Sequence, residues 1–169
     1  MSDYDDIIGM MREEDYPALE EVALMLDDFP TGKDDWLQRY WIINAIDMGS
    51  LTVVEWMLKH GAPVNVVDEE GYSPLLSALE RKDDDKYALL QVLVRAGADM
   101  HLHGIHEWTP LHMAAARNDL KALELFHAAG ADFSVRTEID NYATPLEEAQ
   151  IIGAAPDTIT YLKTLSGSV

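Results

Sequence analysis

Apolar residues recur at helical spacing in short paired segments along most of the chain. In the clearest pair, Leu111, Ala114 and Ala115 mark a short first helix. The second helix ends at Gly130, and its apolar positions are Leu120, Leu123, Leu125 and Phe126. Residues three or four apart lie on one face of a helix, and glycine at a helix end readily adopts positive φ. The pattern therefore predicts a helical hairpin.

The N-terminal part shows the same periodicity. Residues 5–13 and 17–27 each suggest a helix, and the second segment would bury Leu19, Val22, Ala23 and Leu26. We expect these two helices to cap one end of a stacked array, because a terminal unit must expose one side to water. The sequence is therefore divided into an acidic N-terminal helical capping pair, residues 1–35, and a repeat array, residues 36–169.

Two short motifs recur with a period of about 35 residues. The first is a Ser or Thr followed by Pro and Leu, with prolines at 74, 110 and 145. The second begins Gly-Ala, with glycines at 61, 97 and 130. A Ser or Thr hydroxyl caps a helix N-terminus, and Pro is tolerated in the first turn because its missing N–H would have no helical partner. Each motif pair therefore predicts one repeat that starts with a capped helix.

These motifs resemble the ankyrin-repeat family over about residues 36–165. The similarity is strongest in residues 61–75 and 109–132, where Thr109 to His112 read Thr-Pro-Leu-His and the hairpin slots hold Asp68 and Gly71. The resemblance implies an all-α ankyrin-repeat solenoid of stacked helical hairpins joined by β-hairpin-like loops. It implies about four repeats, the last of them a C-terminal cap.

Four segments depart from the family pattern. In the last repeat, the segment around residues 137–141 contains two extra residues. Residues 40–43 read Tyr-Trp-Ile-Ile where a capping Ser or Thr is expected, so the start of this helix should be irregular. Residues 81–86 contain about three extra residues and should form a longer charged loop. Glu107 stands where the hairpin usually has glycine, which predicts a distorted turn before Trp108.

Composition and charge narrow the classes of function. The chain has no cysteine, and its 12 Lys and Arg residues stand against 31 Asp and Glu residues, giving a net charge of −19. Such a charge repels nucleic-acid phosphates, so direct nucleic-acid binding is not expected. The acids in residues 1–35 could form a solvated face that aids solubility, or attract a basic partner. With no signal-like or membrane-length segment, we expect a cytoplasmic protein without membrane contact.

No catalytic motif stands out in the sequence. We therefore expect no enzyme activity, cofactor or metal, although His101, His103 and His106 are spaced closely enough to suggest zinc ligands. The resemblance assigns His101 to a hairpin slot usually held by Asn, and His112 to hydrogen bonding within and between repeats. A histidine-based metal-dependent sensor is kept as a less favoured alternative.

The resemblance implies that a partner protein binds the concave face built from hairpin tips and first helices. Three aromatic residues near the hairpin tips, called the aromatic row below, are Tyr72, Trp108 and Tyr142. These rings could anchor a partner or simply cover neighbouring hairpins. The other candidate tip positions are Glu69, Glu70, Ile105, His106, Asp140 and Asn141. The candidate first-helix positions are Asp47, Met48, Glu80, Arg81 and Arg117.

The favoured function is therefore a non-catalytic module that binds another protein with a basic surface. The alternative is an inhibitor or immunity protein that neutralises a basic toxin or enzyme, because small size and strong acidity suit that role. We expect a monomer or a weak homo-oligomer. The sequence names neither the partner nor the pathway.

Overall fold

The computed structural model describes residues 3–139 and 141–166. Within these ranges the chain is all-helical, and its only strand-like element is an isolated antiparallel bridge between Lys33 and Tyr40. The chain divides into two compact units, Met1–Ala98 and Asp99–Val169. The architecture of each unit is given separately.

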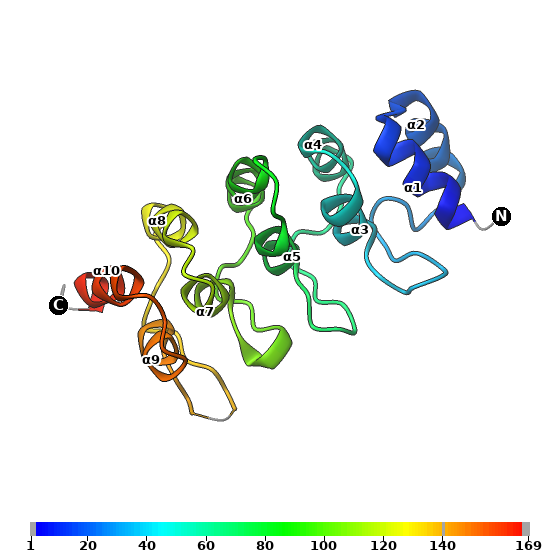
Figure 1. Ribbon diagram of the computed structural model, residues 1–169. Helices are drawn as coiled ribbons and strands as arrows, with labels where there is room; N and C mark the ends of the chain where they lie inside the picture. The colour runs from blue at the N-terminus through cyan, green and yellow to red at the C-terminus, as the bar shows by residue number, and fades with distance from the viewer. Residues whose placement is uncertain (1–2, 140, 167–169) are drawn as a thin grey trace. The chain divides into compact units, whose positions relative to one another are not determined.

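The first unit consists of three helix pairs (Figure 1). Its helices are α1 (Asp3–Glu13), α2 (Tyr16–Met25), α3 (Trp41–Met48), α4 (Leu51–Lys59), α5 (Pro74–Glu80) and α6 (Lys86–Arg95). Each pair packs its two helices together, and the first helices contact one another in the order α1, α3, α5. The pairs are thus stacked, as the resemblance implied.

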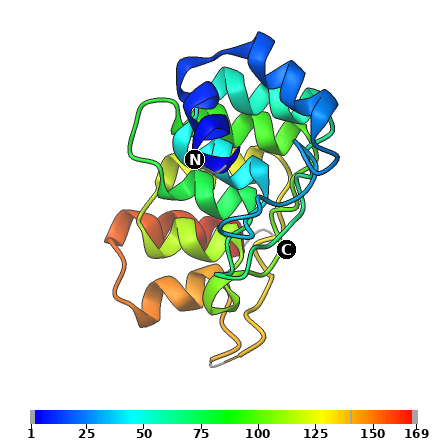
Figure 2. The same ribbon diagram turned by 90° about the vertical axis from the view of Figure 1, so that its right-hand side faces the viewer.

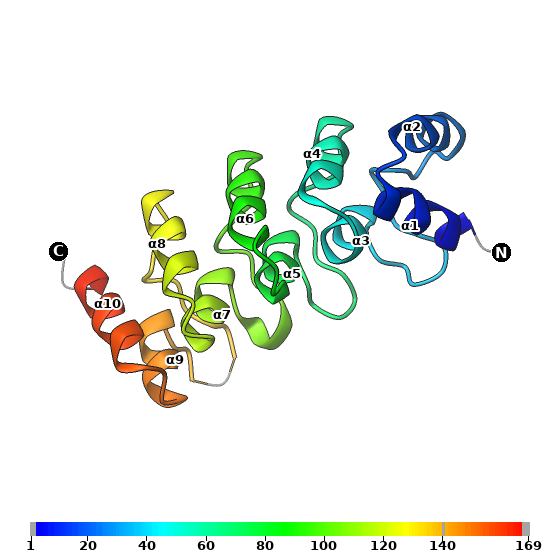
Figure 3. The same ribbon diagram turned by 45° about the horizontal axis from the view of Figure 1, so that its top comes forward.

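The second unit repeats this plan with two helix pairs, best seen in Figure 3. Its helical elements are the short 3₁₀ turn η1 (Ile105–Glu107), α7 (Pro110–Ala116), α8 (Leu120–Ala128), α9 (Pro145–Ile151) and α10 (Pro156–Ser166). Helix α7 packs against both α8 and α9, and α9 packs against α10. Helix α10 closes this unit and ends at Ser166.

Side-chain caps explain where the first helices begin. Ser73 accepts the Leu76 N–H at the start of α5, and Thr144 accepts the Glu147 N–H at the start of α9. In α3 the capping position is Tyr40, which makes no side-chain capping bond within the described residues. The predictions of capped starts and of one irregular start are both confirmed.

The core consists mainly of aliphatic side chains from the first helices and from the inner faces of the second helices. Trp41 and Trp56 are buried, and Phe29 packs against both with ring centroids 5.3 and 6.0 Å away. The prediction of which α2 residues are buried was only partly right. Leu19 is fully buried, but the other three predicted core residues are half-buried because α2 ends the stack and lacks a neighbour on one side.

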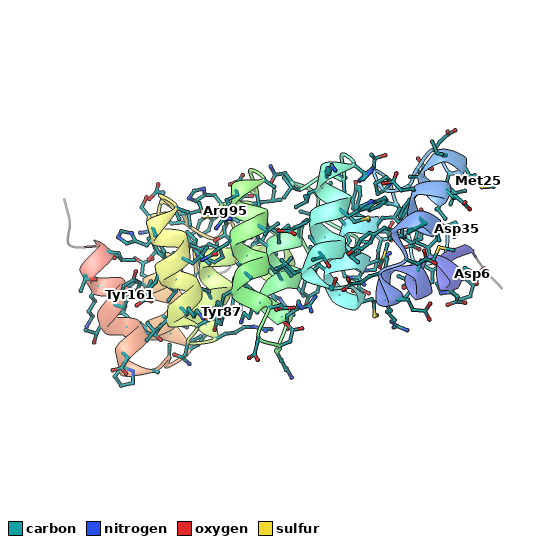
Figure 4. All side chains as sticks on the ribbon, turned by 90° about the horizontal axis from the view of Figure 1, so that it is seen from above. Asp6, Met25, Asp35, Tyr87, Arg95 and Tyr161 are labelled. Atoms are coloured by element: carbon teal, nitrogen blue, oxygen red, sulfur yellow. The ribbon has the colours of Figure 1, made fainter. Side chains whose placement is uncertain are left out.

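The exposed side of α2 is apolar at its C-terminal end. Met25 ends the helix and is exposed (Figure 4), and Leu24 before it is 88% exposed. Helix α2 ends two residues before the predicted Asp27. These side chains lie on the second helix of their pair.

The loops between pairs form hairpin-like turns closed by backbone hydrogen bonds. In the first unit the Asp34 N–H donates to Arg39 O at 2.8 Å, and the Asp68 N–H donates to Tyr72 O at 2.9 Å. In the second unit the closing bonds run from Gly104 N to Trp108 O and from Thr137 N to Ala143 O, both at 3.0 Å. The expected β-hairpin-like connections are therefore present, without strands in the described residues.

Candidate functional site

The first hairpin presents a large exposed aromatic side chain that sequence reasoning missed. Asp34 is buried, and its Oδ1 accepts the backbone N–H groups of Trp36 and Leu37. Trp36 at the tip is 69% exposed. The sequence does contain a signal for this hairpin, because Asp34 precedes the hairpin residue Asp68 by one repeat length of 34 residues. No Gly follows Asp34 in the turn, so the recurring sequence motif did not predict this hairpin.

The second hairpin is held by a buried carboxylate. Oδ1 of Asp68 accepts the N–H groups of Glu70 at 3.0 Å and Tyr72 at 2.8 Å. Its Oδ2 lies 3.2 Å from Nε of Arg39, and only 1% of its side chain is exposed. Asp68 therefore sets the backbone shape of the tip and ties it to the start of the preceding repeat.

Most of the candidate residues of this unit lie together around one pocket of about 370 Å³. We call it the Arg39–Arg81 pocket; its wall includes Arg39, Asp47, Glu70, Tyr72, Glu80 and Arg81. Five of these six were candidates from the sequence, and Arg39 was not. The remaining two candidates of this unit, Glu69 and Met48, are exposed, and Met48 accepts a hydrogen bond from Arg12 to its sulfur.

Ion pairs set the electrostatics of this pocket. Nη2 of Arg39 lies 2.7 Å from Oδ2 of Asp47. Burial raises the pKa of Asp47 above its usual value, and the nearby Asp68 charge raises it further, although Arg39 opposes both effects. Arg81 donates through Nη1 to the carbonyl oxygens of Ile46 at 2.7 Å and Gly49 at 3.0 Å. Both guanidinium groups are thus engaged in holding neighbouring segments of the first unit together.

In the second unit, the first hairpin is distorted as expected at Glu107. His106 and Glu107 both have φ near +57°, within the 3₁₀ turn η1. His106 is exposed, and its ring centroid lies 5.9 Å from that of Trp108 in an edge-on contact. Trp108 and Ile105 are half-buried. Trp108 therefore both packs on its own hairpin and shows part of its ring to solvent.

The last hairpin carries the most exposed member of the aromatic row. Tyr142 is 62% exposed, and its carbonyl oxygen accepts a hydrogen bond from Nη1 of Arg136 at 2.6 Å. Arg136 also pairs with Glu147, with Nη1 to Oε2 at 2.7 Å. The Thr144 backbone N–H and the Arg136 guanidinium lower the pKa of Glu147. Asn141 is exposed beside this pair and Arg117 is exposed at the end of α7, whereas Asp140 lies outside the described residues.

The candidate histidines serve as bridges between hairpins. Nε2 of His101 accepts the Asp132 N–H at 2.9 Å, and Nε2 of His103 donates to Arg136 O at 2.9 Å. The two loops that they join lie on the same side of the helices (Figure 2). His106 is turned toward Trp108 instead. In the described ranges no group of three His, Cys, Asp or Glu side chains could hold a metal ion.

His112 is fully buried at the start of α7. Its Nδ1 accepts the Thr109 N–H at 3.3 Å, and its Nε2 donates to Ala143 O at 2.9 Å. Burial lowers its pKa, the Ala143 carbonyl opposes this in part, and the neighbouring His103 adds to the lowering. The role implied by the resemblance is confirmed, because the ring bonds within its own repeat and to the next hairpin.

Comparison with known proteins agrees with this geometry. The family model "Ankyrin repeats (many copies)" matches residues 42–94, and the model "Ankyrin repeat" matches residues 106–138. The chain belongs to the ankyrin-repeat family. Ankyrin repeats are a general protein–protein interaction module, and proteins built from them are usually non-catalytic; neither family match is to an enzyme domain.

Three curated relatives of this ankyrin-repeat protein are much longer than it is. The chain is 39% identical over 82 residues to the B-cell lymphoma 3 protein homolog of Mus musculus, covering 48% of this chain and 18% of that protein. It is 33% identical over 97 residues to the ankyrin repeat protein nuc-2 of Neurospora crassa, covering 57% and 9%. It is 30% identical over 129 residues to the RelA-associated inhibitor of Mus musculus, covering 76% and 15%. The matched regions thus span less than a fifth of these relatives.

No helix in the part of the chain that the structure describes is both long enough and apolar enough to cross a membrane.

Proposed function

We propose that this ankyrin-repeat protein binds another protein through its hairpin tips and the first helices of its pairs. The observation that carries the proposal is the side chains at the tips: Trp36 and Tyr142 are exposed at 69% and 62%. Aromatic residues are over-represented among the side chains that dominate binding energy. The tips are also fixed by backbone N–H groups that donate to the carboxylates of Asp34 and Asp68, so binding would order few loop residues.

The partner proposed here has a basic surface. The chain carries a net charge of −19, and Asp35, Glu69 and Glu70 are exposed near the tips of the first two hairpins. A field of this sign attracts cationic surfaces and accelerates their association. We expect the protein to act as a monomer or a weak homo-oligomer in such a complex.

A second candidate is the inhibitory form of this function. One relative, 30% identical over 129 residues, is named RelA-associated inhibitor. An acidic ankyrin-repeat protein could inhibit by covering the basic active site of a toxin or enzyme, as an immunity protein would. This candidate predicts that the captured partner loses its activity at a one-to-one ratio, whereas an adaptor would leave that activity intact.

Capture of the partner tests the proposal. Immobilised wild-type protein and the variants Trp36→Ala and Tyr142→Ala would be exposed to native lysate, and captured proteins identified by mass spectrometry. Leu24→Ala is the matched control, because Leu24 is 88% exposed on a second helix. We expect one basic protein to bind wild type and the control stoichiometrically, and both tip variants weakly. Equal capture by all four proteins would exclude the hairpin tips as the binding surface.

The salt dependence of association tests the charge argument separately. The association rate with the identified partner should fall steeply between about 0.05 and 0.5 M salt, because ions screen exposed charges. An association rate that salt leaves unchanged would refute electrostatic attraction and leave the tip surface itself standing.

A further inference from the structure

A cluster of side chains outside the candidate site joins the N-terminal helix pair to the next pair. Glu20 lies on α2, and its Oε1 accepts the indole Nε1–H of Trp56, on α4, at 3.0 Å. The same oxygen lies 3.0 Å from Nε2 of His60, the residue that caps the C-terminus of α4. We call this contact the Glu20–His60 bridge. It connects two helices that are not neighbours in the chain.

Both nitrogens of the His60 ring face acceptors. Nδ1 lies 2.8 Å from Trp56 O, a backbone carbonyl that can only accept. Nε2 faces the carboxylate of Glu20, which can only accept when it is ionised. A neutral imidazole has one N–H, whereas an imidazolium has one on each nitrogen. The protonated ring therefore makes both bonds, and the neutral ring makes one while its lone pair points at the other acceptor.

The stacking of His60 on Trp56 favours the same form of the ring. The two ring centroids lie 4.0 Å apart. A cation close to the face of an indole ring is attracted by its π electrons. Hydrogen bonding and stacking thus both act in favour of the imidazolium.

Glu20 is the charged group that separates the two forms of the ring. Helix α4 packs against α3 and α6, and the bridge joins it to α2. The other charged residues on these four helices are Glu21, Asp47, Glu55, Lys59, Lys86 and Arg95. Asp27 and Asp28 follow α2 and are exposed. In the described ranges the ion pair with Glu20 is the only one that His60 makes.

The bridge lies where α2 has few other ties to the array. Helix α2 packs chiefly on α1, and α1 packs on α3. Figure 1 shows α2 beside α4 at the end of the first unit. Segments with few packing contacts open locally at low free energy. A lost side-chain contact between α2 and α4 should therefore be felt first as local opening of α2.

We propose that the Glu20–His60 bridge is a pH-sensitive switch, which holds α2 on α4 when His60 is protonated and loosens α2 as the pH rises through neutrality. Histidine is the side chain whose charge ordinarily changes between about pH 5 and 8. Because the protonated ring makes the bonds, their contribution is present at the lower pH and is lost as the pH rises. The sign is opposite to that expected for the buried, neutral ring of His112.

Hydrogen exchange of the α2 amides measures how firmly this helix is held. Exchange in the full chain would be followed by mass spectrometry at about pH 6 and about pH 8, both above the usual titration range of glutamate. The rates would be corrected for the intrinsic pH dependence of exchange. In wild type we expect the protection of α2 to fall by roughly two- to fivefold at the higher pH, as suits an ion pair with side chains 25% and 53% exposed.

Two variants connect this response to the bridge. Glu20→Gln removes the charge and keeps an oxygen that accepts the Trp56 indole N–H. His60→Gln removes the titrating ring. Each variant should show no fall in α2 protection between the two pH values. His127→Gln is the matched control, because His127 is exposed on α8, and it should keep the wild-type response.

The double variant Glu20→Gln/His60→Gln isolates the pair from other effects of each substitution. A coupling of roughly two- to fivefold in α2 protection is expected at the lower pH and none at the higher pH. Histidines of the second unit are present in all four proteins, so their titration cancels. Wild-type protection that pH leaves unchanged, a wild-type response in His60→Gln, or additive effects at the lower pH would each overturn the inference. No partner is needed, so the result is independent of the proposed function.

Discussion

His112 offers the sharpest test of how the repeats support one another, because one buried ring joins a helix start to the next hairpin. The substitution His112→Ala removes the donor to Ala143 O, at 2.9 Å, and the acceptor for the Thr109 N–H, at 3.3 Å. Ala143 and Thr109 are themselves buried, so water cannot replace the lost bonds without opening the packing. The hairpin 137–143, which carries Asn141 and Tyr142, loses its side-chain tie to α7.

The expected loss follows from the geometry. Leaving one buried carbonyl without its donor destabilises by about 1–3 kcal/mol. Removing a large, fully buried side chain adds a cavity, and comparable large-to-small core substitutions cost about 2–5 kcal/mol. Because the surroundings relax and the two contributions overlap, we expect a total of about 3–5 kcal/mol. Glutamine at this position can keep a donor and an acceptor, so His112→Gln should lose roughly half as much.

The pH dependence gives an independent signature. Burial places the pKa of His112 below its unfolded value of 6.5. Below that pH the unfolded chain binds a proton on His112 that the folded chain does not, so stability falls as the pH decreases and is unaffected above about 7.5. The slope from this one group is at most about 1.4 kcal/mol per pH unit. His112→Gln should lack this contribution.

Urea unfolding followed by circular dichroism, with hydrogen exchange of the α7 and α9 amides, would measure both effects. Wild type, His112→Gln and His112→Ala would be compared at pH 7.5 and pH 5.5. His127→Gln is the control, because His127 is exposed on α8. A loss below about 1 kcal/mol in His112→Ala would refute the bridging role. A difference between wild type and His112→Gln that does not shrink at the lower pH would refute the buried neutral ring.

Three further predictions follow from single side chains. Asp68→Ala should destabilise the first unit by about 1–3 kcal/mol in urea unfolding, because the Glu70 and Tyr72 N–H groups lose their acceptor and the half-buried Arg39 loses one of its carboxylate partners. Asp83→Ala, at an exposed pair, should change stability by under about 0.5 kcal/mol. Ser73→Ala should cost about 0.5–2 kcal/mol through the lost cap of α5, which thermal unfolding would detect. Trp36→Ala should weaken partner binding by about 2 kcal/mol or more in calorimetry while the urea midpoint stays unchanged.

Much of the helical architecture was predictable because its signals are local. Ser73 and Thr144 cap helices through bonds that span only three residues, and each is followed by proline in the chain itself. The distorted turn at Glu107 was predictable for the same reason, since a missing glycine is visible in the sequence. Burial in α2 was less predictable. Whether Val22 is covered depends on a neighbouring helix, which periodicity within α2 cannot report. The boundary after residue 35 stays a prediction.

The candidate site was harder to predict because its organisation depends on contacts between distant residues. The repeat period of the sequence predicted that Glu70, Tyr72 and Arg81 lie near the tips and first helices. It did not predict that these residues line one pocket. Arg39 was not predicted to belong to the site, because its role depends on Asp68, which lies 29 residues away in the chain. The binding roles of the aromatic row stay predictions.

The side chains that shape the tips are largely different from those that the tips expose. Buried Asp34, Asp68 and His112 satisfy backbone groups inside the hairpins and between repeats, whereas Trp36 and Tyr142 face solvent. Exposed residues can therefore change partner preference with little effect on folding, while the buried polar residues keep the loops rigid. Rigid loops lose little conformational entropy on binding, so a few anchors can suffice for useful affinity. The guanidinium groups of Arg39 and Arg81 belong with the buried residues, because they hold neighbouring segments of the first unit together.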